Sequence, residues 1–127
     1  MLAIVNAQLL TITDGIKEGS VLVDDQGTIA AVGAVEIPEG ATIIDGQGKV
    51  LMPGMIDAHG HAGVWEEGLG FEGSDGNEMT DPITPHLRAL DAINPHEEGI
   101  AEALRAGVTA MCILPGSANV VGGQGVV

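Results

Sequence analysis

The sequence predicts an α/β fold class with an N-terminal all-β part: a small β-sandwich-like domain followed by one βαβ unit. Two observations support this division. Up to residue 52, short apolar runs alternate with turn-forming residues at the spacing of a small sandwich or barrel. Beyond Pro53-Gly54 the order becomes apolar run, long polar stretch, helical pattern and second apolar run, which is typical of parallel sheets. We therefore expect two domains, residues 1–53 and 54–127.

The first domain is expected to contain about five short, mainly antiparallel strands. Asp14-Gly15, Asp25-Gln26-Gly27 and Asp45-Gly46-Gln47-Gly48 are turn signals. The apolar runs between these turns give the expected strands, at 2–5 continuing through 9–13, then at 20–23, 28–32, 41–44 and 49–52. This pattern indicates a class of fold and not a function.

The second domain is expected to begin with a strand at 54–60 and a long polar loop that reaches residue 94, with a helical turn or two near 85–93. A helix at 95–106 follows. Asn94 is a good N-cap, Pro95 suits the first helical position, and Glu97 stands where a capping box needs it. Gly107 should end the helix.

A second parallel strand is expected at 108–114, where an almost continuous apolar run indicates burial on both faces. A glycine-rich loop from Pro115 follows, and the sequence stops at Val127. Domains rarely stop just after a parallel strand, because its edge is left uncovered. We therefore expect the sequence to be truncated.

Charge restricts the classes of partner. The chain has 18 Asp and Glu against 4 Lys and Arg, a net charge of −14. Because such a surface repels phosphate groups, binding to nucleic acid or to anionic membranes is not expected. No run approaches the roughly 18–20 apolar residues of a membrane span, and the N-terminus has no secretory pattern. The single Cys112 cannot form an internal disulfide, which fits the cytoplasm.

Three polar residues alternate along the strand expected at 54–60 and just beyond it. Asp57, His59 and His61 should share one face, because side chains in a strand repeat every two residues, about 6.5 Å apart. Two imidazoles at this spacing can hold one metal ion if the backbone bends, which Gly60 allows. Asp57 lies one layer deeper and is better placed to orient the ligands than to bind the ion. His-x-His is by itself a weak signal, and the alternative is a pair of half-buried polar residues at a strand end.

The stretch around these residues resembles a family signature. Residues 49–61, Lys-Val-Leu-Met-Pro-Gly-Met-Ile-Asp-Ala-His-Gly-His, resemble the amidohydrolase superfamily. In that family an N-terminal β domain leads through Pro-Gly into the first strand of a (βα)8 TIM barrel. Residues 3–7 and 24–33 resemble the opening of the same family. Within it, the chain looks most like the imidazolonepropionase-like branch.

The resemblance implies a fold and a chemistry. Residues 1–53 would be part of a composite β-sandwich, and residues 54–127 the first strand, long loop, first helix and second strand of a truncated barrel. His59 and His61 would bind Zn²⁺ or another divalent metal, as one or two ions, which activates water for attack on an amide or imine carbon. The family completes the site with two more His and an Asp general base from later strands. These residues, including the catalytic base, are expected beyond residue 127.

Other polar residues are weaker candidates. Asn119 and Gln124, in the glycine-rich loop, are candidates for substrate contact, with loop geometry as the alternative. His86 and His96 are expected to be loop or capping residues. Cys112 should be a buried, unreactive residue of the second strand. Four acids of the long loop are expected to face solvent rather than substrate: Glu72, Asp75, Glu78 and Asp81.

Two functional hypotheses follow. In the first, the chain is the N-terminal part of a metal-dependent hydrolase of a non-peptide carbon–nitrogen bond in a small molecule, such as a cyclic amide. The full-length enzyme would be cytoplasmic and homo-oligomeric. In the second, the 127-residue chain is a catalytically inert fragment or a non-enzymatic β-domain module, since a barrel needs about 250 residues to close. A reading frame that continues and encodes the missing His, His and Asp would support the first hypothesis.

Overall fold

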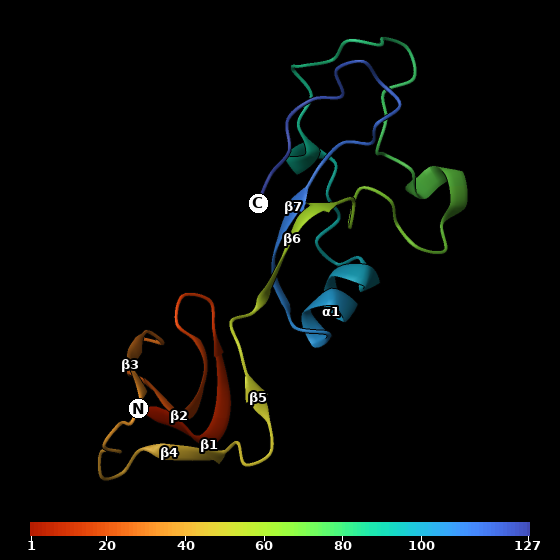
Figure 1. Ribbon diagram of the computed structural model, residues 1–127. Helices are drawn as coiled ribbons and strands as arrows, with labels where there is room; N and C mark the ends of the chain where they lie inside the picture. Colours follow the sequence, from red (N-terminus) through yellow and green to blue (C-terminus); the bar gives the residue numbers. More distant parts are fainter. The chain divides into compact units, whose positions relative to one another are not determined.

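A computed structural model describes residues 1–127, which form two compact units, Met1–Pro53 and Gly54–Val127 (Figure 1). The chain is mostly β, with seven strands, one α-helix and two short 3-10 helices. Each unit has a sheet of its own, with five strands in the first and two in the second.

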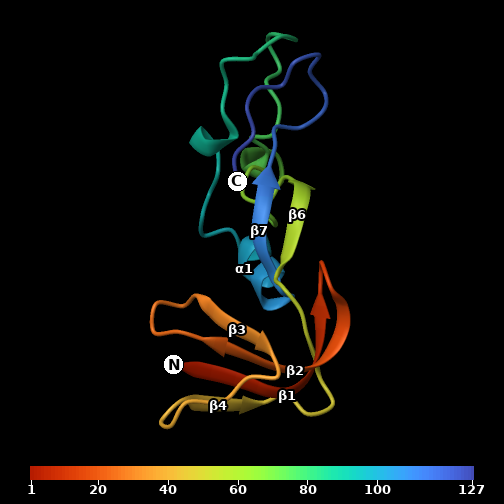
Figure 2. The same cartoon turned by 60° about the vertical axis from the view of Figure 1, so that its left-hand side comes forward.

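The first unit is a single sheet arranged around β1, Leu2–Thr11 (Figure 2). β2 (Gly15–Val23) pairs with β1 in antiparallel orientation, and β3 (Ile29–Gly33) pairs in the same way with β2. On the other edge of β1, β4 (Thr42–Asp45) and β5 (Val50–Leu51) pair with its two halves, and both are parallel to it. The prediction of mainly antiparallel strands is thus only half right. After β3 the chain crosses to the far edge of β1 instead of continuing the meander.

The second strand is longer than the sequence indicates. β1 ends at Thr11, two residues before the expected end of the first run at residue 13, and β2 begins at Gly15, five residues before the expected start at residue 20. The added residues 15–19 contain one apolar side chain, Ile16, beside Lys17 and Glu18, so no apolar run marks them. They are strand because the tight turn places Gly15 directly opposite Thr11 and the backbone hydrogen bonds continue from there.

A β-bulge interrupts the pairing of β1 with β2. Between Ile4 and Ala7, β1 carries one residue more than its partner. Asn6 adopts φ 58° there, a left-handed conformation that asparagine tolerates. Its side-chain amide donates a hydrogen bond to Oδ1 of Asp45 at 3.1 Å, which ties the bulge to β4. Because the extra residue reverses the alternation of side chains, Leu9 falls on the same face as Ile4.

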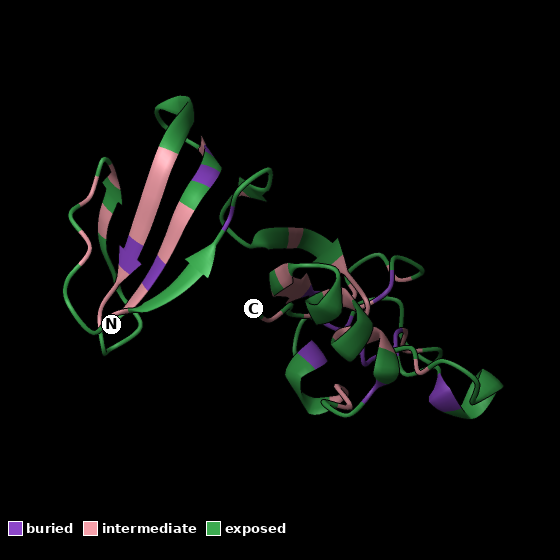
Figure 3. Cartoon of the chain, turned by 90° about the horizontal axis from the view of Figure 1, so that it is seen from below, coloured by how far each residue is buried: buried purple, intermediate pink, exposed green.

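That face of the sheet is apolar and open. Its side chains line a groove of about 430 Å³, formed by residues that include Ile4, Leu9, Val21, Ile29, Val32 and Leu51. Ile29 and Val32 are at least half exposed, and most of the strand surface in this unit is exposed or half-buried (Figure 3). A sandwich buries such a face against a second sheet. The first unit therefore consists of a single sheet, whereas the sequence predicts a sandwich-like domain.

The second unit contains the expected βαβ order. β6 (Met55–Gly60) and β7 (Val108–Ile113) pair in parallel, and α1 (Glu98–Arg105) lies between them in the sequence and contacts β7. The prediction of a parallel strand pair joined through a helix is confirmed. The long loop contains two 3-10 turns, η1 (Gly70–Gly73) and η2 (Ala89–Asp91), and the second lies where a helical turn is predicted.

The predicted start of the helix is wrong by three residues. α1 begins at Glu98, and Glu97 is its N-cap without a side-chain hydrogen bond. Asn94 is used earlier, because its Oδ1 accepts a hydrogen bond from the backbone N–H of His96 at 3.0 Å in a local turn. The end of the helix is as predicted, since Gly107 follows it with φ 96°.

β7 is less buried than its apolar sequence predicts. Ile113 is its one buried residue, and Cys112 is half-buried. The physical reason is that β7 has a single neighbouring strand, β6, whereas burial on both faces needs a wider sheet covered on each side. Ile113 forms a small core with Val64 and Ala89 from the long loop.

Candidate metal site

The candidate ligands lie where β6 ends. Between Asp57 and Gly60, β6 has one residue more than β7, so its backbone bends. Oδ1 of Asp57 accepts a hydrogen bond from the backbone N–H of His59 at 3.0 Å, across this irregularity. A Cβ atom at Gly60 would lie 2.8 Å from Oδ2 of Asp57, so a side chain at this position would displace the Asp57 carboxylate. Asp57 thus shapes the backbone that carries both histidines, and neither imidazole is among its hydrogen-bond partners.

The two imidazoles approach each other. The ring centroids of His59 and His61 are 5.3 Å apart, and the ring planes are 88° apart. Two histidines bound to one zinc ion, with Zn–N bonds of about 2.0–2.1 Å in tetrahedral geometry, have centroids roughly 5 Å apart. The observed separation therefore fits a pair of ligands to one ion. That they bind a metal stays a prediction.

The tautomer of His61 follows from its hydrogen bond. Nδ1 lies 2.8 Å from the carbonyl oxygen of Leu114, the residue directly after β7. Because a carbonyl oxygen only accepts, Nδ1 must carry the proton and donate it, which leaves the lone pair on Nε2. Metal-binding histidines commonly donate their second ring N–H to a carboxylate or a backbone carbonyl. The N–H of Leu114 in turn donates to the carbonyl of Gly60 at 2.9 Å, which anchors the arrangement on both strands.

The pair is only part of a metal site. No group of three or more His, Cys, Asp or Glu side chains converges so as to hold an ion. Since structural and catalytic zinc sites have about four ligands, the chain supplies two imidazoles and not a complete shell. His86 and His96 are exposed, and each is far in sequence from the pair, as expected for loop residues.

Asn119 and Gln124 fasten the long loop to the segment after β7. Nδ2 of Asn119 donates hydrogen bonds to the carbonyls of Glu78 at 2.7 Å and Asp81 at 2.9 Å. Nε2 of Gln124 donates to the carbonyl of Pro85 at 3.0 Å. These bonds correspond to the loop geometry that the sequence leaves open as an alternative, and contact with substrate stays a prediction. Oδ1 of Asn119 is buried and has no hydrogen-bond partner.

Two further residues of this region were not singled out from the sequence. Thr84 is only 2% exposed, and its hydroxyl donates to the carbonyl of Val121 at 3.1 Å, which adds to the fastening of the loop. Trp65 packs edge to face against His61, with ring centroids 4.7 Å apart. In the sequence, the feature that indicates a contact of Trp65 with His61 is its position four residues after His61, in a turn that contains a glycine.

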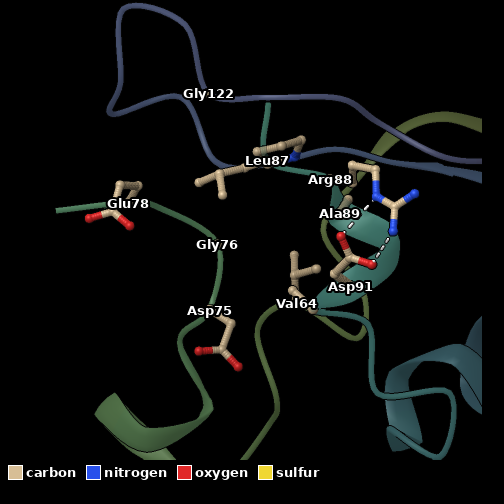
Figure 4. Close-up of a pocket in the computed structure, with 11 residues that line it drawn as sticks. Val64, Asp75, Gly76, Glu78, Leu87, Arg88, Ala89, Asp91 and Gly122 are labelled. Carbon is tan, nitrogen blue, oxygen red and sulfur yellow. Dashed lines mark hydrogen bonds and ion pairs between the residues drawn. The ribbon is translucent and has the colours of Figure 1, made fainter. Parts of the chain in front are cut away.

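A pocket of about 190 Å³ lies between the long loop and the segment after β7, which contributes Pro115 and Gly122 (Figure 4). On one side, the guanidinium group of Arg88 donates two hydrogen bonds to the carboxylate of Asp91, at 2.8 and 2.6 Å. This contact lowers the pKa of Asp91 and raises the pKa of Arg88. The cation is therefore already neutralised by its neighbour, and the pocket has no free positive charge to attract an anionic ligand.

The acidic residues of the loop are engaged locally or exposed. Glu78 accepts hydrogen bonds from the hydroxyl and backbone N–H of Thr80, and these bonds lower the pKa of Glu78. Asp81 accepts a hydrogen bond from the N–H of Ile83 at 2.9 Å. Glu72 and Asp75 are exposed, as expected for a solvated loop.

Known proteins are similar to this chain over most of its length. Amidohydrolase tasK of Hapsidospora irregularis is 43% identical over 111 residues, which cover 84% of this chain and 11% of that protein. The crystal structure of an amidohydrolase from Thermotoga maritima MSB8 matches 98% of this chain with 49% identity and a TM-score of 0.90. The chain belongs to the amidohydrolase superfamily. The resemblance of residues 49–61 to this superfamily is thereby confirmed.

This amidohydrolase chain spans only part of its relatives, 11% of the tasK protein and 32% of the Thermotoga chain. An uncharacterised protein of known structure, 21% identical, has a TM-score of 0.50 over 87% of this chain and 25% of its own, which shows likeness of fold alone. No family model matches the sequence. None of the helices in the amidohydrolase chain is long and apolar enough to cross a membrane.

Proposed function

We propose that the chain is the N-terminal part of a metal-dependent hydrolase that cleaves a non-peptide carbon–nitrogen bond, in a cyclic amide or a related small molecule. The observation that carries the proposal is the histidine pair, with ring centroids 5.3 Å apart and the Nε2 lone pair of His61 left free by the bond from Nδ1 to Leu114. Membership of the amidohydrolase superfamily supports it.

In this proposal the residues of the chain bind and orient, and the ion supplies the reactivity. His59 and His61 are the ligands, the carbonyl of Leu114 fixes the tautomer of His61, and Asp57 holds the backbone of His59. A divalent metal, Zn²⁺ or another, as one or two ions, supplies the Lewis acidity that activates a water molecule as the nucleophile. The catalytic base is not among residues 1–127, and we expect it in a later part of the whole protein.

We propose that the second unit is the beginning of a (βα)8 TIM barrel, with β6, α1 and β7 as its first strand, first helix and second strand. This proposal is supported by the position of the histidines at the carboxyl end of β6, where barrel enzymes hold their catalytic groups. The open apolar face of the first unit would be one half of a composite β-sandwich. We expect a later segment of the whole protein to cover the groove formed by Ile4, Leu9 and Val32.

For the whole protein we propose a place in the imidazolonepropionase-like branch, a cytoplasmic location and a homo-oligomeric assembly. Its partner is a small-molecule substrate rather than nucleic acid or a membrane, since a net charge of −14 opposes both anionic surfaces. The single half-buried Cys112 is consistent with a reducing compartment.

The four histidines of the chain provide a matched test. Zinc binding to the 127-residue chain, measured by isothermal titration calorimetry, should be lost in His59→Ala and in His61→Ala. It should be unchanged in the controls His86→Ala and His96→Ala, whose imidazoles lie outside the pair. Equal zinc affinity in all four variants would exclude the proposed site. Activity is then assayed on the product of the complete reading frame, where the same two substitutions should abolish hydrolysis of cyclic amides.

A further inference from the structure

The imidazole of His61 has neighbours on three sides. The carbonyl of Leu114 accepts the hydrogen of Nδ1, the ring of His59 lies edge to face on one side, and the indole of Trp65 lies against it with planes 70° apart. A single N–H···O hydrogen bond tolerates a range of angles, so it leaves a range of χ1 and χ2 values open to the His61 ring. A second contact narrows that range, and with it the direction of the Nε2 lone pair.

The backbone after β6 turns so that Trp65 folds back onto His61. The carbonyl of His61 accepts hydrogen bonds from the N–H groups of Val64 at 3.1 Å and Trp65 at 3.3 Å. Gly63, with φ 80°, allows this tight turn. The spacing between His61 and Trp65 is therefore set by the local backbone.

The other side of the indole is also held. Nε1 of Trp65 donates a hydrogen bond to the hydroxyl of Ser74 at 2.7 Å. A Cβ atom at Gly76 would lie 2.7 Å from Cε2 of the indole, so the chain comes as close to Trp65 as a residue without a side chain permits. The backbone supports this arrangement, because the N–H of Asp75 donates to the carbonyl of Val64 at 2.9 Å. Trp65, although partly exposed, thus contacts both the histidine and the segment that contains Ser74 and Gly76.

We propose that Trp65 is a positioning residue for His61. The indole, held by Ser74 and Gly76, keeps the imidazole plane oriented so that Nε2 points into the space shared with His59. The inference rests on the proposed function for its consequence, which is metal affinity. The ring orientation itself is a property of the metal-free chain and is measured separately.

The first experiment determines the tautomer and the ring-proton shifts of His61 in the metal-free chain. In ¹⁵N-labelled chain, long-range ¹H–¹⁵N spectra should show His61 as a single Nδ1–H tautomer, with ring protons shifted by the neighbouring indole. Trp65→Leu should give averaged or multiple His61 signals. Ser74→Ala, which removes only the hydrogen bond to the indole, and Gly76→Ala, whose Cβ atom would displace the indole, should each shift the His61 ring protons in a folded protein. Phe71→Leu is the control, since Phe71 is an exposed aromatic residue of the same loop.

The second experiment measures zinc affinity of the same variants by calorimetry. Trp65→Leu should weaken binding about tenfold, within the range found when groups that orient metal ligands are removed, and Trp65→Phe should weaken it less. Phe71→Leu should bind as the unaltered chain does. Unchanged His61 signals in Trp65→Leu and Gly76→Ala would overturn the proposal, and so would altered signals with unaltered zinc affinity.

The outcomes separate this inference from the proposed function. If His59→Ala and His61→Ala bind zinc as tightly as the unaltered chain, the metal site fails, and with it the consequence assigned to Trp65. If those two variants lose zinc while Trp65→Leu keeps both its affinity and its His61 signals, only the positioning role fails.

Discussion

Nδ1 of His61 lies 2.8 Å from the carbonyl oxygen of Leu114, a bond that joins the end of β6 to the end of β7 across 53 residues of sequence. Because of this bond, the tautomer of His61, a candidate metal ligand, depends on the pairing of β6 with β7. If β6 and β7 separate, Nδ1 loses its acceptor and the two neutral tautomers of His61 are free to interconvert. Substitutions that destabilise the second unit should therefore also weaken zinc binding.

Gly54→Ala tests this dependence. A Cβ atom at residue 54 would lie 2.2 Å from Oγ1 and 2.3 Å from Cγ2 of Thr109, so β6 and β7 must move apart. We expect the second unit to lose about 1–3 kcal/mol of stability, with weaker zinc binding. The measurement is denaturant unfolding followed by the fluorescence of the single Trp65. Thr109→Ala in the same chain should restore part of the loss, and if Gly54→Ala alone unfolds like the unaltered chain, the close packing of β6 on β7 is refuted.

Asn119→Asp should release the long loop. The substitution replaces the amide that donates to the carbonyls of Glu78 and Asp81 by a carboxylate that faces two acceptors. We expect a cost of about 2 kcal/mol and faster hydrogen exchange at residues 78–85. Asn77→Asp is the matched control, because Oδ1 of Asn77 acts as the acceptor, from the N–H of Ala118 at 3.1 Å, and aspartate keeps that oxygen. Equal protection in the two variants would contradict the role of Asn119.

The carboxyl group of Asp45 should make the first unit sensitive to acid. The side-chain amide of Asn6 and the N–H of Gln47 donate to it and lower its pKa. Because the folded pKa lies below the unfolded value of about 3.9, the stabilisation is present above that pH and is lost as the pH falls through the folded pKa. Asn6→Gly keeps the left-handed backbone and removes the amide. We expect an NMR titration to give a higher pKa for Asp45 in this variant, and an unchanged pKa would exclude the bond from Asn6.

The 127-residue chain on its own should show no measurable amidohydrolase turnover. Two imidazoles provide about half of a zinc shell, and the catalytic base, a role worth about 10²- to 10⁴-fold in rate, is expected in a later part of the whole protein. The assay compares the zinc-loaded chain with the product of the complete reading frame on a panel of cyclic and acyclic amides. Zinc-dependent turnover by the shorter chain within about tenfold of the longer one would mean that catalytic groups lie within residues 1–127 after all.

The sequence by itself determined most of the element order. Turn signals such as Asp14-Gly15 and Asp25-Gln26-Gly27 delimit strands, and Gly107 ends α1, because glycine adopts backbone conformations that other residues avoid. The apolar runs at 54–60 and 108–114 separated by a helical pattern predict the parallel pair, and His59-Gly60-His61 predicts two imidazoles side by side. These are local properties, set by backbone geometry and by the period of a strand or helix.

Tertiary structure decided what the residues do for one another. The parallel pairing of β4 and β5 with β1, the Nδ1–H tautomer of His61 and the contact of Trp65 with His61 all depend on neighbours that the sequence does not identify. Asn119 could equally have faced a ligand, and it faces the carbonyls of the long loop because the segment after β7 runs beside that loop. The physical reason is that hydrogen bonds and ring contacts act over a few ångströms, so their partners are chosen by the arrangement of strands and not by distance along the chain.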